Sequence, residues 1–173
     1  GIHVLAEALK DIGDVQVIAP DRERSAVSHS FSMNHPIRAR RTDEHTTVID
    51  GTPTDCVMFG MLGYLDGRPD LVVSGINTGP NMGDDVTYSG TVAAALEATM
   101  LKSPSFAISM GERVPYGTEY ADRDIFADAA AFAVVVAKDI LSDGLPGGTF
   151  LNINVPRECR GAGIRKVGKR VYY

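Results

Sequence analysis

Side chains that could bind a metal ion or a phosphate are concentrated in one stretch, SGINTGPNMGDDVTYSGT, which runs from Ser74 to Thr91. Hydroxyl, amide and carboxylate oxygens of this kind coordinate hard cations such as Mg²⁺, Mn²⁺ or Ca²⁺. On chemistry alone, the adjacent carboxylates of Asp84 and Asp85 are the first candidates for metal ligands. The alternative, that two aspartates in a Gly-containing loop only form a solvated turn, is equally well supported.

The end of this stretch has the composition of an anion site. Ser89, Gly90 and Thr91 precede a segment from Val92 to Ala98 that has strong helix propensity and no breaker. The first N–H groups of a helix have no partner within the helix and favour negative charge. Small residues and hydroxyls at that position would let a phosphate bind. In the simpler alternative, Ser89 or Thr91 only caps its own helix.

The elements that must position this stretch follow from the pattern of apolar residues. Leu71, Val72 and Val73 directly precede it and predict a short buried strand. Similar patterns predict strands at 15–19, 46–49, 106–109, 150–155 and 164–171, and an edge strand at 36–40. Helices are predicted at 2–12, 53–65, 92–98 and 124–141, and a polar loop at 116–124.

Strands that alternate with helices indicate an α/β fold with three layers, in which helices cover both faces of a mostly parallel sheet. Ligands in such folds bind beyond the carboxyl ends of the strands. We therefore expect three polar loops, at 20–25, at 74–91 and directly after Ser109, to lie together at that edge of the sheet.

Composition restricts the function classes further. The 173 residues suggest a single domain, and the net charge of -5 argues against binding of a nucleic-acid polymer. No apolar run approaches the roughly 20 residues of a membrane span, so no membrane partner is expected. Cys56 and Cys159 are the only cysteines and form no CxxC motif, and a domain of this size does not need a disulfide, which together indicate a reducing cytoplasm. The histidines lack zinc-ligand spacing, and neither a GxGxxG motif, a Walker lysine nor a nucleophile elbow is present.

Four collinear segments resemble the SurE family of stationary-phase survival proteins: APDRERSAVSHS (19–30), GTPTDCV (51–57), SGINTGPNMGDDVTYSGTVAAALEA (74–98) and LNINVP (151–156). The resemblance implies a Rossmann-like core and a metal-dependent phosphatase that hydrolyses nucleoside 5'-monophosphates. The resemblance also implies activity toward 3'-nucleotides and short polyphosphate. It also implies a homo-oligomer, either a dimer or a tetramer.

The resemblance also implies roles for single residues. One divalent cation, Mg²⁺ or Mn²⁺, would be held by Ser25 and Asn77. The phosphate would be held by four residues of the same stretch, namely Asn81, Ser89, Gly90 and Thr91. Asp84 and Asp85 match family positions that are not metal ligands, so the resemblance overrules the choice made on chemistry alone.

The chain departs from the family at both ends. The family opens with a strand and an Asn-Asp-Asp-Gly loop, whose two aspartates supply the metal's carboxylates and the catalytic acid, whereas Gly1 matches the part just after that loop. We therefore expect the catalytic aspartates upstream of Gly1, none within this chain, and an exchanged C-terminal segment beyond Tyr173. On this expectation the chain is a single domain that by itself has little activity. A non-catalytic phosphate or nucleotide sensor, and an oligomerisation domain, stay open as alternatives.

Overall fold

The computed structural model describes residues 1–114 and 123–169, and its described strands form two three-stranded sheets. In the first sheet β1 (Val17–Pro20) lies parallel to β3 (Thr46–Ile49), and β2 (Ala39–Arg41) lies antiparallel to β3 at the edge. In the second sheet β4 (Val72–Asn77), β5 (Ser105–Met110) and β6 (Leu151–Val155) are all parallel. The predicted, mostly parallel arrangement is confirmed. The edge strand predicted at 36–40 is present as β2, although it begins at Ala39.

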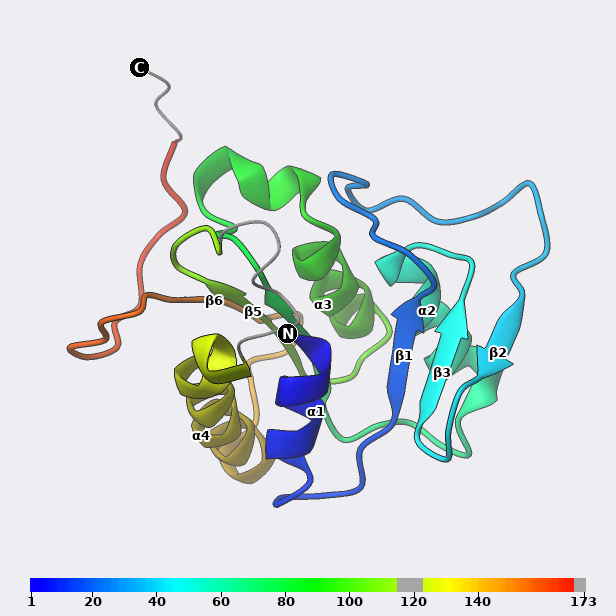
Figure 1. The fold of residues 1–173 in the computed structure, drawn as a ribbon, viewed down its shortest axis with the longest axis horizontal. Coiled ribbons are helices and arrows are strands. Elements are labelled where there is room, and N and C mark those ends of the chain that lie inside the picture. The colour runs from blue at the N-terminus through cyan, green and yellow to red at the C-terminus, as the bar shows by residue number, and fades with distance from the viewer. Residues whose placement is uncertain (115–122, 170–173) are drawn as a thin grey trace.

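Helices cover the two faces of the second sheet (Figure 1). On one face, α1 (Ile2–Leu9) and α4 (Ala127–Asp143) pack against each other and against the strands. On the other face, α3 (Gly90–Met100) packs on β4 and β5, and α2 (Pro53–Phe59) packs beside α3 and on β1. The predicted three layers are therefore present. Among the described residues, no helix has the length and apolar character needed to cross a membrane.

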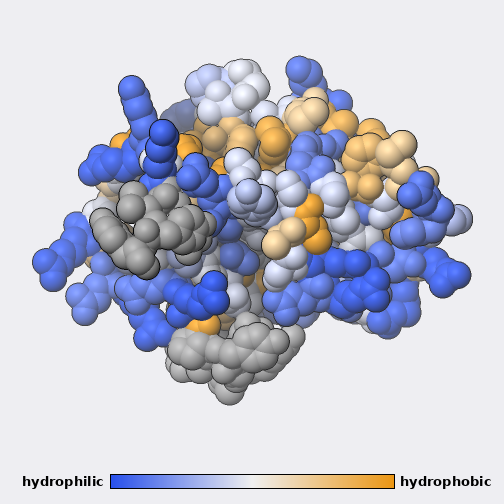
Figure 2. Space-filling view, turned by 90° about the horizontal axis from the view of Figure 1, so that it is seen from above, coloured by the Kyte–Doolittle hydropathy of each residue, from blue (hydrophilic) through white to orange (hydrophobic). Residues whose placement is uncertain are grey.

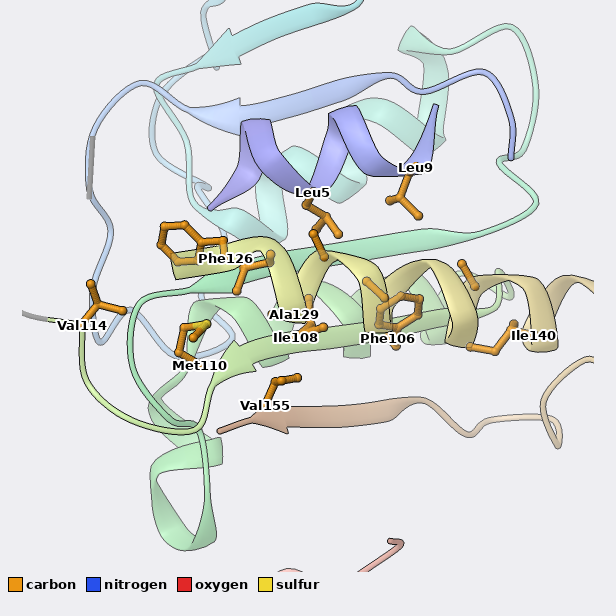
Figure 3. Close-up of a cluster of buried hydrophobic side chains, with 14 residues drawn as sticks. Leu5, Leu9, Phe106, Ile108, Met110, Val114, Phe126, Ala129, Ile140 and Val155 are labelled. Carbon is orange, nitrogen blue, oxygen red and sulfur yellow. The ribbon is translucent and has the colours of Figure 1, made fainter. Parts of the chain in front are cut away.

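The core lies on both faces of β5, because all six residues of this strand are buried. Phe106, Ile108 and Met110 alternate along the strand and join Leu5 and Phe126 in the larger cluster, under α1 and α4 (Figure 3). Ala107 points to the other face and meets a small cluster with residues of α3. A strand that is covered on both faces has a nearly continuous apolar sequence, which is why the strand at 106–109 could be predicted.

Several element boundaries differ from the prediction. β4 continues past the predicted apolar run to Asn77, because Ser74 pairs with Ala107 and Asn77 with Ser109 of β5. β1 begins at Val17 rather than at residue 15, and α1 ends at Leu9, before the predicted stop at Gly13. For the two strands, pairing with a neighbouring strand rather than local propensity decides where the element begins or ends.

Two predicted helices include a turn that is not α-helical. The helix predicted at 53–65 is α2 followed by a π-helical turn, η1 (Gly60–Tyr64). The helix predicted from 124 begins with a 3-10 turn, η3 (Arg123–Phe126), before α4. The strand predicted at 164–171 is wrong for its described part, since residues 164–169 form no strand. Most of the loop predicted at 116–124, and residues 170–171, lie outside the described residues.

Candidate functional site

Two segments that follow parallel strands meet on the upper side of the molecule in Figure 1. The first, residues 21–34, follows β1, and the second, residues 78–89, follows β4 and contains the 3-10 turn η2 (Gly83–Tyr88). Ser28 joins them, because its backbone N–H donates to the Tyr88 carbonyl at 3.1 Å and its hydroxyl donates to the Thr87 carbonyl at 2.7 Å. The segment that carries Ser25 is therefore attached directly before Ser89.

The start of α3 lies at this junction. Ser89 is the N-cap, and its Oγ accepts a hydrogen bond from the Val92 N–H at 3.2 Å, so the capping alternative is confirmed for Ser89. Its hydroxyl hydrogen is not used by that bond, because a serine oxygen accepts and its hydrogen donates independently. The next residue, Gly90, is buried, and a Cβ there would lie 2.9 Å from Pro53 Cγ and 3.2 Å from Val27 Cγ2. The absence of a side chain at Gly90 therefore lets both neighbouring segments pack onto the start of α3.

The two predicted asparagines differ in their surroundings. Asn77 is the last residue of β4, and its Nδ2 donates to the Gly79 carbonyl at 2.7 Å, so its Oδ1 is the atom left for a cation. Asn81 is buried, and its Nδ2 donates to Ser109 Oγ at 2.7 Å. That bond uses one of the two Nδ2 hydrogens of Asn81 and leaves the second for a ligand.

Ser25 is exposed on the first segment, and its hydroxyl donates to Glu23 Oε1 at 2.8 Å. In the described part of the chain no hydrogen bond joins Ser25 to Asn77, and Thr91 makes no side-chain hydrogen bond. The structure thus attaches the segment of Ser25 to the residues directly before α3. Asn77 ends β4 and directly precedes the loop that leads to the same helix.

Hard divalent cations such as Mg²⁺ and Mn²⁺ prefer oxygen ligands, so we compared the side chains at this junction with that preference. Ser25 Oγ and Asn77 Oδ1 are hydroxyl and amide oxygens, which are acceptable ligands for Mg²⁺ or Mn²⁺. Asp84 and Asp85 lie in the first turn of η2. Among residues 1–114 and 123–169, no three His, Cys, Asp or Glu side chains are grouped as a metal site would require. The described residues therefore fit as part of a coordination shell made of neutral oxygens.

Sequence reasoning missed the contacts that hold the first segment in place. His29 Nε2 lies 2.8 Å from Glu97 Oε2 of α3, a contact that was not predicted from the sequence. Asp55 of α2 is 2% exposed and accepts three hydrogen bonds, from the Ser32 N–H at 2.9 Å, the Ser32 hydroxyl at 2.8 Å and the Thr52 N–H at 2.8 Å. The capping-box spacing of Thr52 and Asp55 could have revealed half of this arrangement.

The Asp55 contacts predict a pH-dependent contribution to stability. Burial raises the pKa of Asp55, but the hydrogen bonds from Thr52 and Ser32 outweigh it, so the pKa lies below its usual value. A carboxylate of this kind stabilises the fold above its unfolded pKa of about 4, and that stabilisation is lost as the pH falls through the lower, folded value.

Asp55→Asn should therefore lower the free energy of unfolding at pH 7 by about 1–3 kcal/mol. The variant should also lose less stability than the wild type when the pH falls below about 4. Urea unfolding of the variant and the wild type, at pH 7 and at a pH below about 4, measures both effects. Asp66→Asn, at an exposed aspartate, is the matched control and should behave as wild type. Equal stability of Asp55→Asn and wild type at pH 7 would contradict the role assigned to Asp55.

The surface above the junction is mixed in character. Figure 2 looks down on this side and shows hydrophilic residues at both flanks, with an apolar band across the upper part of the view. Exposed apolar side chains belong to both segments, among them Phe31, at 51% exposure, and Tyr88, at 62% exposure. Polar and apolar side chains are thus both exposed on this side of the molecule.

Fold and site together define a class of protein. Three α/β layers, with polar loops joined at the carboxyl ends of parallel strands and one loop leading into a helix N-terminus, make a Rossmann-like protein, a class in which ligands bind at that edge of the sheet. The family described as survival protein SurE matches residues 1–173. The chain therefore belongs to the SurE family.

Individual relatives agree with this assignment. The chain is 49% identical to the 5'-nucleotidase SurE of Pelobacter propionicus, over 99% of the chain and 68% of that protein. It is 48% identical to the 5'-nucleotidase SurE of Geobacter metallireducens, over 99% of the chain and 67% of that protein. The crystal structure of the SurE protein from Aquifex aeolicus superposes with a TM-score of 0.90 at 41% identity, covering 100% of this chain and 69% of the other.

Proposed function

We propose that this protein is a metal-dependent phosphatase that hydrolyses nucleoside 5'-monophosphates to a nucleoside and inorganic phosphate. The names of the relatives support this reaction class. The observation that carries the proposal is the attachment of Ser28 to the end of η2, which brings the segment of Ser25 against the start of α3. Oxygen donors for a cation and N–H donors for a phosphate thereby lie on adjoining segments.

The phosphate is proposed to bind at the start of α3. The N–H groups of Gly90 and Thr91 belong to the first turn of an 11-residue helix and have no intrahelical acceptor. The hydroxyl hydrogens of Ser89 and Thr91 and the second Nδ2 hydrogen of Asn81 add donors. Donors fixed by the fold stabilise the charge that develops on the phosphoryl oxygens without having to reorganise during the reaction.

One divalent cation, Mg²⁺ or Mn²⁺, is proposed to bind Ser25 Oγ and Asn77 Oδ1. The hydrogen bond from Asn77 Nδ2 to Gly79 supports the assignment, because it leaves Oδ1 as the available end of the amide. When bound, such a cation acts as a Lewis acid that withdraws charge from a phosphoryl oxygen. Ser25 and Asn77 would orient it toward the phosphate, since both are attached to the loop that leads to Ser89.

The nucleoside part of the substrate is proposed to lie over the exposed side of η2. Tyr88, directly before Ser89, offers an aromatic face on which a base can stack. Activity toward 3'-nucleotides and short polyphosphate, a cytoplasmic location and assembly into a dimer or tetramer belong to the same proposal, on the strength of the family resemblance.

The decisive experiment is phosphate release from a nucleoside 5'-monophosphate by the full-length protein, with Mn²⁺ or Mg²⁺ added and after chelation by EDTA. We expect release that requires the cation and that yields one nucleoside for each phosphate. Saturable nucleotide binding without release would instead indicate a sensor. Neither binding nor release would leave an oligomerisation domain, whose assembly state sedimentation would measure.

Thr91→Ala should weaken phosphate binding without unfolding the protein. Loss of a hydrogen bond to a charged group should raise the KM for the nucleotide, and the inhibition constant of inorganic phosphate, about tenfold. Little change in melting temperature is expected, because the Thr91 hydroxyl has no hydrogen-bond partner in the described structure. Thr42→Ala, on the exposed turn between β2 and β3, is the matched control. A KM for Thr91→Ala within about twofold of wild type would remove Thr91 from the site.

A further inference from the structure

Strand β6 holds the loop between β4 and α3 through a single loop residue, Asn81. Asn154 Oδ1 accepts from the Asn81 N–H at 2.8 Å, and Asn154 Nδ2 donates to the Asn81 carbonyl at 3.1 Å. Asn152 Nδ2 donates to the same carbonyl at 2.8 Å. The side chain of Asn81 donates to Ser109 Oγ of β5 at 2.7 Å. Both polar groups of the Asn81 backbone, together with its side chain, are thus bound to the adjacent strands β5 and β6.

The two asparagines of β6 have different roles in this contact. Asn152 and Asn154 are two residues apart in the strand and therefore lie on one face of it. Asn154 binds both the N–H and the C=O of Asn81, as the backbone of a neighbouring strand would. Asn152 contributes one donor, and its buried Oδ1 has no hydrogen-bond partner among the described residues. The orientation of the Asn152 amide is determined, because only its Nδ2 can donate to a carbonyl.

This arrangement differs from what stability alone would favour. The neighbouring β5 is buried throughout, and a strand beside it gains most from apolar side chains. An unsatisfied buried amide oxygen such as Asn152 Oδ1 costs stability that an apolar residue would not lose. The benefit lies in the loop, since residues 78–89 include Gly79 and Gly83 and lead directly into Ser89. Binding Asn81 to β6 restricts the path of that loop.

We propose that Asn154 is a positioning residue for phosphate binding, which acts through the backbone of Asn81, with Asn152 as a weaker support. This inference rests on the proposed function, because it assigns a task to the loop that leads to the proposed phosphate site. Asn154 does not contact the substrate. It fixes the peptide of Asn81, and thereby the position of the Asn81 side chain and the approach of the loop to Ser89.

The test compares Asn154→Leu with Asn152→Leu. In both variants an asparagine is replaced by an uncharged side chain of similar volume that cannot form hydrogen bonds. Asn154→Leu should raise both the KM for a nucleoside 5'-monophosphate and the inhibition constant of inorganic phosphate about tenfold, with kcat reduced less than about threefold. Asn152→Leu should change each constant less than about threefold, because the paired contact of Asn154 persists. Equal constants for Asn154→Leu and wild type, or equal effects of the two variants, would overturn the proposal.

Hydrogen exchange provides a readout that needs no catalytic activity. In the folded wild type the Asn81 N–H should exchange slowly, because it donates to Asn154 Oδ1, and in Asn154→Leu it should exchange at least about tenfold faster. The Gly111 N–H, which donates to Val155 O at 2.7 Å, reports on whether β6 is intact and should not change. Unchanged protection of Asn81 would overturn the proposal even if the wild type hydrolysed no nucleotide.

A second variant guards against failure of Asn154→Leu to fold. Asn154→Ser is small and polar, and its hydroxyl is too short to bind both backbone groups of Asn81. It should raise KM and speed the Asn81 exchange in the same direction as Asn154→Leu. A wild type that releases no phosphate, combined with faster Asn81 exchange in either variant, would refute the proposed nucleotidase function while leaving the attachment of the loop by Asn154 established.

Discussion

Asn77→Ala is expected to lower kcat/KM for a nucleoside 5'-monophosphate about 100-fold while leaving the melting temperature nearly unchanged. The small effect on stability follows from the structure, because among residues 1–114 and 123–169 the Asn77 side chain makes just a local hydrogen bond, to Gly79 at 2.7 Å. The large effect on activity follows from the proposed loss of the Oδ1 ligand to the cation. Phosphate release, measured at several concentrations of Mn²⁺, tests both statements.

Two further variants make this prediction specific. Asn77→Asp keeps an oxygen at the position of Oδ1 and should retain binding of Mn²⁺ by calorimetry, whereas Asn77→Ala should weaken it at least about tenfold. Asn34→Ala, at an exposed asparagine of the first segment, is the control and should match wild type in every assay. Equal Mn²⁺ affinity for Asn77→Ala and wild type would exclude Asn77 as a ligand.

Gly75→Ala is expected to lower the free energy of unfolding more than the other substitutions proposed for this protein. A Cβ at this position would lie 2.2 Å from the Ile108 carbonyl oxygen and 2.9 Å from Ile108 Cγ2, and the φ of Gly75 is +141°. The backbone of β5 cannot move away, because Ile108 is 0% exposed and pairs with Ile153 of β6. We expect the free energy of unfolding to fall by about 3 kcal/mol or more.

The matched control is Gly79→Ala, four residues further along the same connection. A Cβ at Gly79 would meet no atom within 4 Å, so the free energy of unfolding should change by less than about 1 kcal/mol. Urea unfolding of both variants gives the comparison directly. If Gly75→Ala were as stable as Gly79→Ala, the close approach of β4 to β5 at Gly75 would be wrong.

The strands and helices were largely predictable because local patterns determine them. The continuous apolar run of β5 and the helix-forming run after Thr91 were both identified. Ser89 was predictable as a cap because serine favours that position. The end of β4 was not, because Ser74 and Gly75 are typical loop residues, and only pairing with β5 extends the strand to Asn77.

The candidate site likewise has one part that the sequence could predict and one part that it could not. The residues of the stretch from Ser74 to Thr91 could be nominated from their chemistry and from the family resemblance. Their supports could not, because Ser28, Asp55 and Asn154 act through partners 23 to 73 positions away in the chain.

By itself, the sequence determined most of the strands and helices, their order, and which loop holds the candidate ligands, since these depend on neighbouring residues. Only the tertiary structure decided that Asn154 binds the backbone of Asn81 and that Ser28 binds the end of η2. The physical reason is that a hydrogen bond between distant residues depends on how the packed strands and helices bring two backbones together, and no local pattern records that distance.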